Sequence, residues 1–230
     1  MNRLVEPEML DELAPADPRA TRSRRDLRRL NAWMGHARIM AGALARTLEA
    51  AAPQRIADLG GGDGRFLLSV AKSLRGRWPT VDAVVVDRLE AFDHTAEREF
   101  LKLGWRVRPE TVDVRTWLES HRGSREGIVT NLFLHQFTAG QLGEMLGLAA
   151  EAAPVFVAVE PRRGPWPWGL SRMLGLIGFG EVTCNDAPVS VRAGFRGHEL
   201  AALWPDAREW VLTERRAGLF SHLFIAQRRQ

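Results

Sequence analysis

The sequence predicts an α/β fold in which a mostly parallel sheet closes in an antiparallel hairpin. Between residues 55 and 160, short β-branched runs alternate with longer segments of helical spacing, which is typical of βαβ units. A glycine-rich stretch separates the first of these runs from the first helical segment, as in many ligand-binding turns. Near the C-terminus two strand-like runs follow each other across a short polar turn, which predicts the hairpin.

The N-terminal part is expected to lie outside this alternation. Residues 1–20 are rich in Pro, Asp and Glu, so we predict an irregular leader. From about Thr21, apolar residues recur at alternating three- and four-residue spacing, which predicts one amphipathic helix that ends at Pro53. Its apolar stripe consists of Leu27, Leu30, Met34, Ala37, Ala41, Leu44 and Leu48. We therefore assign residues 1–52 to a leader and helical cap, and residues 53–230 to the main domain.

The elements of the main domain follow from the same patterns. The predicted parallel strands are Arg55–Leu59, Val81–Val86, Trp105–Val112, Gly127–Phe133 and Val155–Val159. The predicted helices are Arg65–Arg75, Glu90–Leu103, Thr116–His121 and Gln141–Ala152. The closing hairpin is predicted from Glu209–Thr213 and Leu219–Ala226. Residues 161–196 fit no βαβ unit, and we expect an insertion there.

Composition and charge exclude few function classes. A chain of 230 residues is long enough for one domain with a full core, and a formal charge of +4 permits contact with nucleic acid without demanding it. The only cysteine is Cys184, so no internal disulfide, no cysteine-based metal cage and no bound metal are predicted. No window approaches the ~18 to 20 apolar residues of a membrane span, and the first residues lack a secretory pattern, so we expect a cytoplasmic protein.

The acids of the stretch DLGGGDG point to a cationic ligand. Three of its four glycines, Gly60, Gly62 and Gly64, follow a Gly-x-Gly-x-Gly pattern that fits neither a dinucleotide-binding fingerprint nor a P-loop. Asp58 ends the predicted strand, and Asp63 lies within the loop. Two carboxylates would repel a pyrophosphate, whereas they would attract the ammonium and sulfonium groups of S-adenosylmethionine (SAM). Backbone N–H groups at the start of the following helix suit the carboxylate of the same ligand.

The stretch Asp58–Gly64 resembles motif I of the class I, Rossmann-like SAM-dependent methyltransferases, and further landmarks follow in the order of that family. Asp87 resembles the acid after the second strand that binds both ribose hydroxyls. Asp113 and Val114 resemble the residues at the adenine, although Asp113 is also suited to cap the next helix. Asn131-Leu132 resembles the end of the fourth strand, which faces the methionine part.

The resemblance covers roughly residues 54–230 and implies a fold, a cofactor and a set of site residues. It implies a seven-stranded Rossmann-like sheet with an N-terminal helical cap, and SAM as the cofactor. The cofactor-binding residues that it implies are Asp58, Gly60, Gly62, Gly64, Asp87, Arg88, Asp113, Val114, Asn131 and Leu132. Glu160 resembles the end of the fifth strand, and a surface ion pair with Arg162 or Arg163 is an alternative for it.

The segment NLFLHQF, which follows the fourth strand, resembles the small-molecule branch of the family. It lacks the Asn/Asp-Pro-Pro-Tyr/Phe segment of adenine or glutamine N-methyltransferases, and Cys184 lies outside any context expected for cytosine methylation. The apolar segment after the fifth strand implies an apolar or aromatic acceptor. The stretches RSRRDLRRLNAWMGHARI and VSVRAGFRGHELAALWP resemble a bacterial subgroup that accompanies polyketide synthases, which implies a phenol, enol, pyrone or quinone precursor. His135 is the predicted base or orienting residue, because its pKa is normally near the working pH. The alternative is a histidine that caps a helix or packs beside the cofactor.

The insertion at residues 161–196 is the predicted acceptor lid, because it concentrates tryptophan, leucine and methionine after the fifth strand. A packed helix or a dimer contact is the alternative. With the N-terminal helix, the predicted acceptor pocket comprises Trp33, His36, Glu160, Trp166, Trp168, Met173 and Arg192. The small-molecule acceptor is the expected partner, and the oligomeric state stays open.

The arginine-rich stretch RSRRDLRR, residues 22–29, raises a second hypothesis from another class. Arginines along one helix suit phosphate contacts, as in an RNA methyltransferase or a SAM-fold protein that binds a partner without catalysis. Asp26 interrupts the run and no aromatic residue is interleaved with it, so a solvated helix face is the simpler interpretation. We therefore expect nucleic acid not to be the partner.

Overall fold

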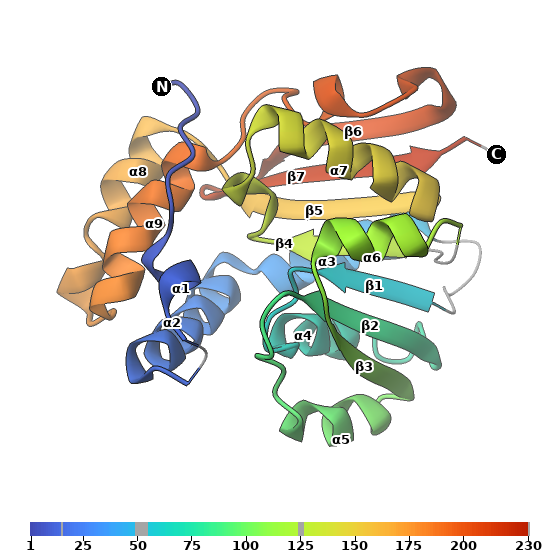
Figure 1. The fold of residues 1–230 in the computed structure, drawn as a ribbon, viewed down its shortest axis with the longest axis horizontal. Helices are drawn as coiled ribbons and strands as arrows, with labels where there is room; N and C mark the ends of the chain where they lie inside the picture. Colours follow the sequence, from blue (N-terminus) through green and yellow to red (C-terminus); the bar gives the residue numbers. More distant parts are fainter. Residues whose placement is uncertain (15, 49–54, 124–126, 230) are drawn as a thin grey trace.

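The computed structural model describes residues 1–14, 16–48, 55–123 and 127–229, and its centre is one seven-stranded sheet of order β3-β2-β1-β4-β5-β7-β6 (Figure 1). The strands are β1 (Arg55–Leu59), β2 (Val81–Asp87), β3 (Trp105–Thr111), β4 (Gly127–Asn131), β5 (Val155–Pro161), β6 (Trp210–Ala217) and β7 (Ser221–Arg228). The first five pair in parallel, and β7 runs antiparallel to both β5 and β6. The predicted parallel sheet with a closing hairpin is confirmed.

Helices cover both faces of the sheet, which explains why its central strands are almost continuously apolar. On one face lie α3 (His36–Thr47), α4 (Arg65–Ser73) and α5 (Thr95–Leu101), and their apolar residues pack with alternate residues of the strands. On the other face lie α6 (Val114–Ser120) and α7 (Ala139–Ala152), which are in front of the sheet in Figure 1. All seven residues of β5 are buried, because both of its faces are covered.

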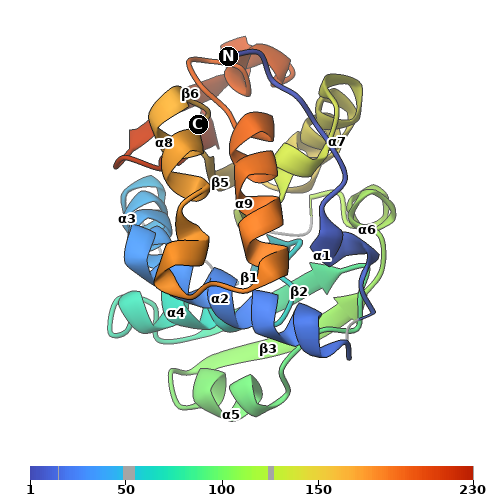
Figure 2. The same ribbon diagram turned by 90° about the vertical axis from the view of Figure 1, so that its left-hand side faces the viewer.

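A third group of helices forms a cap over the carboxyl ends of the parallel strands (Figures 1 and 2). It consists of α1 (Met9–Glu12), α2 (Pro18–Met34), α8 (Pro165–Ser171) and α9 (Glu181–Ala193), with the 3-10 turn η2 (Leu174–Ile177) between the last two. Further 3-10 turns are η1 (Leu134–Gln136), η3 (Ala201–Leu203) and η4 (Ala207–Glu209). The cap therefore joins the N-terminal part to the segment predicted as an insertion.

The N-terminal part differs from its prediction in two ways. The single helix expected from Thr21 is two helices, because Gly35 takes φ +71° and ends α2 with its N–H bonded to the carbonyls of Asn31 and Ala32. The leader expected to be irregular holds α1 and the start of α2, which Asp17 caps. Pro53 and the boundary predicted between residues 52 and 53 lie outside the described residues.

The described residues hold neither a membrane-spanning helix nor a cluster suited to a metal ion. No helix there combines the length and the apolar character that crossing a membrane requires. Likewise, no group of three or more His, Cys, Asp and Glu side chains is arranged there to hold a metal ion.

Candidate functional site

A cavity of about 1270 Å³ lies between the carboxyl ends of β1, β2 and β4 and the helical cap. Pockets for one drug-sized ligand measure about 300–1,000 Å³, so this cavity has room for two ligands side by side. Its walls include the glycine loop after β1, the residues after β4, the leader and the lid segment. The position agrees with the general rule that ligands of open α/β sheets bind beyond the carboxyl ends of the strands.

The glycine loop needs glycine for two separate reasons. Gly60, Gly62 and Gly64 have φ values of +68°, +53° and +72°, which residues other than glycine rarely adopt. In addition, a Cβ on Gly60 would lie 2.2 Å from the Phe133 ring, and one on Gly64 would lie 2.5 Å from the Phe92 ring. Gly60 and Gly62 line the cavity, whereas Gly64, also predicted to bind the cofactor, does not.

Three carboxylates gather around this loop, and one of them has an unpaired oxygen. Asp58 is 1% exposed and lines the cavity, yet its Oδ2 has no hydrogen-bond partner among the described residues. Burial raises the pKa of Asp58 well above its usual value, and the charges of Asp87 and Asp63 raise it further. A buried polar atom without a partner is rare and needs an explanation. Negative charge concentrated in a poorly solvated pocket favours a cationic group there.

The predicted ribose and adenine residues lie along the same wall. Asp87 accepts hydrogen bonds from the backbone N–H of Gly62 and of Leu89, each at 2.9 Å, so it also braces the glycine loop. Asp113 caps α6 through Oδ1, which accepts from Arg115 N and Thr116 N. The capping role is therefore present, and Asp113 lines the cavity as well.

The residues after β4 provide a polar network at the inner end of the cavity. Asn131 Oδ1 lies 2.7 Å from His36 Nδ1, and Asn131 Nδ2 donates to Asn31 Oδ1 at 3.2 Å. His36 Nε2 lies 2.7 Å from the Ser221 hydroxyl. Burial lowers the pKa of His36 to about 4, so the ring is neutral, and it donates from Nδ1 and accepts at Nε2. Leu132 follows with φ +54°, a strained value of the kind that clusters at functional sites.

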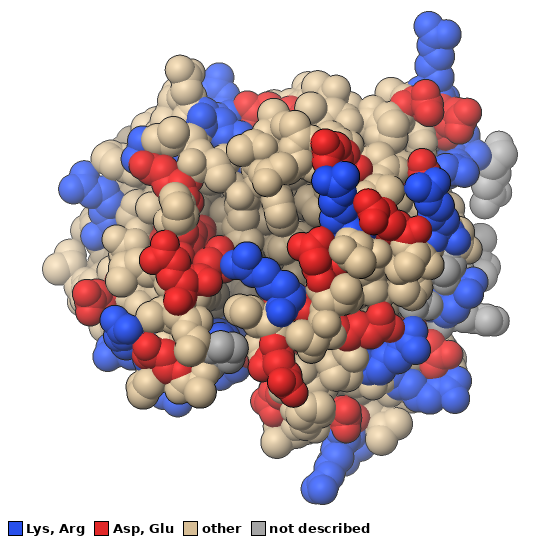
Figure 3. Space-filling view, viewed as in Figure 1, with Lys and Arg blue, Asp and Glu red and all other residues tan. Residues whose placement is uncertain are grey.

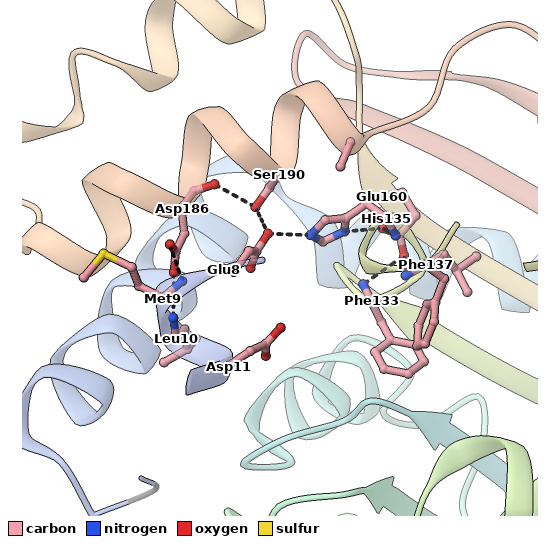
Figure 4. A network of polar contacts seen from close by, with 12 residues as sticks. Glu8, Met9, Leu10, Asp11, Phe133, His135, Phe137, Glu160, Asp186 and Ser190 are labelled. Atoms are coloured by element: carbon pink, nitrogen blue, oxygen red, sulfur yellow. Dashed lines mark hydrogen bonds and ion pairs between the residues drawn. The ribbon is translucent and has the colours of Figure 1, made fainter. Parts of the chain in front are cut away.

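His135 is held between two carboxylates (Figure 4). Its Nδ1 lies 2.8 Å from Glu160 Oε2, and its Nε2 lies 3.1 Å from Glu8 Oε1. Burial alone lowers the pKa of His135, but the hydrogen bonds and charges of Glu160 and Glu8 outweigh burial and raise the pKa to about 10. The ring therefore carries a proton on each nitrogen at neutral pH. In this arrangement it has no lone pair with which to act as a base.

Glu160 supports the loop after β4 and does not line the cavity. Its side chain is completely buried and accepts hydrogen bonds from the backbone N–H groups of Phe133 and Leu134, at 3.0 and 2.9 Å. The alternative ion pair with Arg162 or Arg163 is not formed, and Arg163 pairs with Glu199 instead. Glu160 thus fixes the loop after β4, in place of the predicted contact with an acceptor.

The remaining residues of the predicted acceptor pocket divide into two groups. Trp33, His36 and Met173 line the cavity. Trp166, Trp168 and Arg192 do not: Trp166 is 82% exposed, and Arg192 forms an ion pair with Glu6 at 3.1 Å. Among the predicted cofactor residues, Arg88, Val114, Asn131 and Leu132 all line the cavity.

Sequence reasoning missed the contribution of the leader. Glu8, Leu10 and Asp11 line the cavity, and the Asp186 carboxylate of α9 holds α1 by accepting from the N–H groups of Met9 and Leu10 (Figure 4). Glu8 also accepts from the Ser190 hydroxyl at 2.5 Å. The leader has no hydrophobic periodicity that would have indicated this position. In retrospect, its acidic residues are the one feature of the sequence that is consistent with a place at the cavity.

The arginine-rich stretch makes contacts within the protein. Arg28 forms an ion pair with Asp63 of the glycine loop at 2.5 Å, and Arg22 donates to the Gly178 carbonyl. Arg29 pairs with Asp26 and lies over the Phe179 ring. On the face seen in Figure 3, the basic side chains are scattered and do not gather into one patch. Three of these arginines therefore join α2 to the loop and the lid.

No protein-family model and no curated protein matches the chain in sequence. Solved structures match it in fold. An O-methyltransferase family protein from Burkholderia thailandensis is 20% identical, with a TM-score of 0.58 over 87% of this chain and 58% of its own length. The plantazolicin methyltransferase BpumL in complex with S-adenosylhomocysteine (SAH) is 14% identical, with a TM-score of 0.64 over 93% of this chain and 92% of its own. Human N-acetylserotonin methyltransferase in complex with SAM is 15% identical, with a TM-score of 0.57 over 92% of this chain and 57% of its own length.

These likenesses, all below 25% identity, establish the fold: the chain has the Rossmann-like architecture of class I methyltransferases. The chain spans less than two thirds of the first and third of these proteins and nearly all of the second.

Proposed function

We propose that the protein is a SAM-dependent methyltransferase that acts on a small apolar or aromatic acceptor. The observation that carries this proposal is the Asp58 carboxylate, which is buried at the cavity wall with an unpaired oxygen beside two further acids. Such a site attracts an ammonium or sulfonium group and repels a phosphate. The structures of similar fold that hold SAM or SAH lend support.

The residues that line the cavity suit each part of SAM in turn. Asp58 would bind the ammonium group, and the loop from Gly60 to Gly62 would approach the methionine part closely. Asp87 would take the ribose hydroxyls, and Asp113 and Val114 would adjoin the adenine. When bound, SAM supplies a methyl group activated by the sulfonium. The protein's own part is to bind, orient and exclude water.

The lid supports an acceptor that is largely apolar. Leu170, Met173 and Leu174 of this segment line the cavity, and Phe220 from the turn between β6 and β7 lines it too. The proposed acceptors are phenols, enols, pyrones or quinone precursors, including those derived from polyketides. Holding such a group in line with the activated methyl supplies much of the rate, on the order of 7 kcal/mol in favourable cases.

The part of His135 in this reaction is proposed to be positioning. Base assistance would require the ring to leave Glu8 or Glu160 and to lose a proton, against a pKa of about 10. Its ion pairs instead join the leader to the loop after β4, and Arg3 strengthens the junction by donating to the carbonyls of His135 and Phe137 at 3.1 and 2.7 Å.

Calorimetric titration with SAM and with SAH tests the proposal. The wild type should bind both at micromolar concentrations, and Asp87→Ala should abolish the binding while the fold is retained. A folded wild type that binds neither compound would refute the methyltransferase function. Binding would justify a screen of phenolic and enolic acceptors by the transfer of isotope-labelled methyl.

The alternative, an RNA methyltransferase or a non-catalytic binding protein, depends on arginines 22–29 facing a ligand. Arg28 and Arg29 are engaged within the protein, which argues against it. Filter binding of single-stranded RNA at 50 and 200 mM salt distinguishes the two. RNA binding that weakens steeply with salt would favour the alternative, and no measurable RNA binding is expected.

A further inference from the structure

Several strongly exposed apolar side chains of the cap also line the cavity. Among the described residues, eleven large apolar side chains are strongly exposed, and five of them also line the cavity. We call these five the lip; they are Trp33, Leu170, Met173, Leu176 and Ile177, with exposed fractions of 45% to 79%. Scattered exposed apolar residues are ordinary, but a contiguous group marks a binding surface.

The lip is the outer part of a wall that continues inward. Leu174 and Phe220 carry the apolar lining from the lip into the cavity. At its inner end stand the polar groups of Asn31, His36 and Asn131, which bond to one another. The cavity therefore combines these polar groups, next to the proposed cofactor residues, with an apolar lining whose outer side chains are exposed to solvent.

We infer that the methyl acceptor is an elongated amphipathic molecule, with its methyl-accepting group at the Asn131 end and an apolar tail that lies across the lip. This rests on the proposed function and adds a substrate class to it. A compact acceptor would leave the lip exposed to water. A second copy of the chain could cover the lip from outside, but it would not explain why all five side chains also line the cavity wall.

A series of 4-alkylphenols from 4-ethylphenol to 4-heptylphenol probes the tail. Each is titrated calorimetrically into the protein saturated with SAH, so that binding is read without turnover. Each added CH₂ should tighten the Kd about fourfold, which corresponds to about 0.8 kcal/mol per buried CH₂. A Kd that does not change with chain length would overturn the inference.

Variants of two lip residues test whether the apolar tail of the acceptor lies on the lip. Leu176 and Ile177 are 79% and 61% exposed, so the double variant Leu176→Ser/Ile177→Ser should fold normally. It should bind 4-ethylphenol like the wild type but lose about tenfold in affinity for 4-heptylphenol. Matched controls are Leu101→Ser and Val211→Ser, which change exposed apolar residues away from the cavity and should stay within twofold of the wild type.

The outcomes separate this inference from the proposed function. If the wild type fails to bind SAH, the methyltransferase proposal itself fails. If SAH binds and the lip variant keeps the wild-type dependence on chain length, only the elongated acceptor is refuted. Sedimentation equilibrium measures the oligomeric state of the wild type and of the lip variant. A wild-type dimer that the lip variant converts to monomers would show that the lip is an interface between copies, and it would overturn the inference.

Discussion

The Glu8 carboxylate lies 3.1 Å from Nε2 of His135, although 127 positions separate the two residues in the chain. The other nitrogen of the same ring binds the completely buried Glu160. One imidazolium thus joins the leader, the loop after β4 and the end of β5. Because all three groups are buried or nearly so, the loss of one partner leaves a charge without compensation.

Glu8→Gln should lower the pKa of His135 from about 10 and reduce the free energy of unfolding by about 3 kcal/mol. The matched control is Glu6→Gln, because Glu6 pairs with Arg192 at an exposed site, where an ion pair contributes about 0–1 kcal/mol. Urea unfolding gives the free energies, and NMR titration of the histidine ring protons gives the pKa. A His135 pKa that stays near 10 in Glu8→Gln would contradict the assignment.

The pH dependence of stability follows from the same pair. The pKa of His135 is raised in the folded state, so its contribution is fully present below about pH 6.5 and is lost as the pH rises through 10. We expect the wild type to lose stability between pH 7 and pH 10, and Glu8→Gln to lose less over the same interval. Parallel curves for the two proteins would show that another group governs the alkaline loss.

Asp58→Asn should separate binding from stability. The pKa of Asp58 is raised, so its ionised form disfavours folding as the pH rises, and removing the charge should leave the free energy of unfolding at pH 8 unchanged or higher. SAH should bind at least ~10-fold more weakly, because a hydrogen bond to a charged group contributes about 1.5–3 kcal/mol. Asp82→Asn is the control, since Asp82 pairs with Arg106 on the surface. Equal affinity in all three proteins would disprove the role of Asp58.

Gly60→Ala compared with Gly76→Ala separates steric clash from backbone strain. Both glycines have positive φ, but a Cβ on Gly60 meets the Phe133 ring at 2.2 Å, whereas one on Gly76 meets nothing within 4 Å. We expect Gly76→Ala to cost about 1–2 kcal/mol of backbone strain. Gly60→Ala should cost about 1–3 kcal/mol more for the forced repacking and should also weaken SAH binding. If urea unfolding shows that both variants lose the same free energy of unfolding, the Phe133 ring moves aside at no cost.

Patterns within short windows predicted the sheet well. β1 has the predicted bounds of Arg55–Leu59, because a buried strand before a glycine turn is a local signal. The break at Gly35 was missed because the apolar stripe continues in phase across it, while a single αL residue ends the helix. The helix predicted from Glu90 begins only at Thr95, since the residues before it form the loop that packs on Gly64.

The site was predictable only where it is built from the ends of strands. Asp58, Asp87 and Asn131 stand at strand ends, and parallel strands bring their carboxyl ends to one edge. The roles of Glu8 and Glu160 depend on which segments meet in space, and no spacing along the chain encodes the contact of Glu8 with His135. The pKa of His135 depends on both neighbours, so the histidine predicted as a base carries a positive charge at neutral pH.

The contacts of the leader have a consequence for synthesis on the ribosome. Arg3 donates to the carbonyl of Ala193, 190 positions later, and Glu8 accepts from Ser190. At about 5–20 residues per second, the leader is made roughly 10 to 40 s before its partners. The five parallel strands are synthesised within that interval, whereas β6 and β7 of the same sheet are made only after α9. A nascent chain that stalls before α9 would lack the part of the cavity wall that Ala187, Ser190 and Val191 supply.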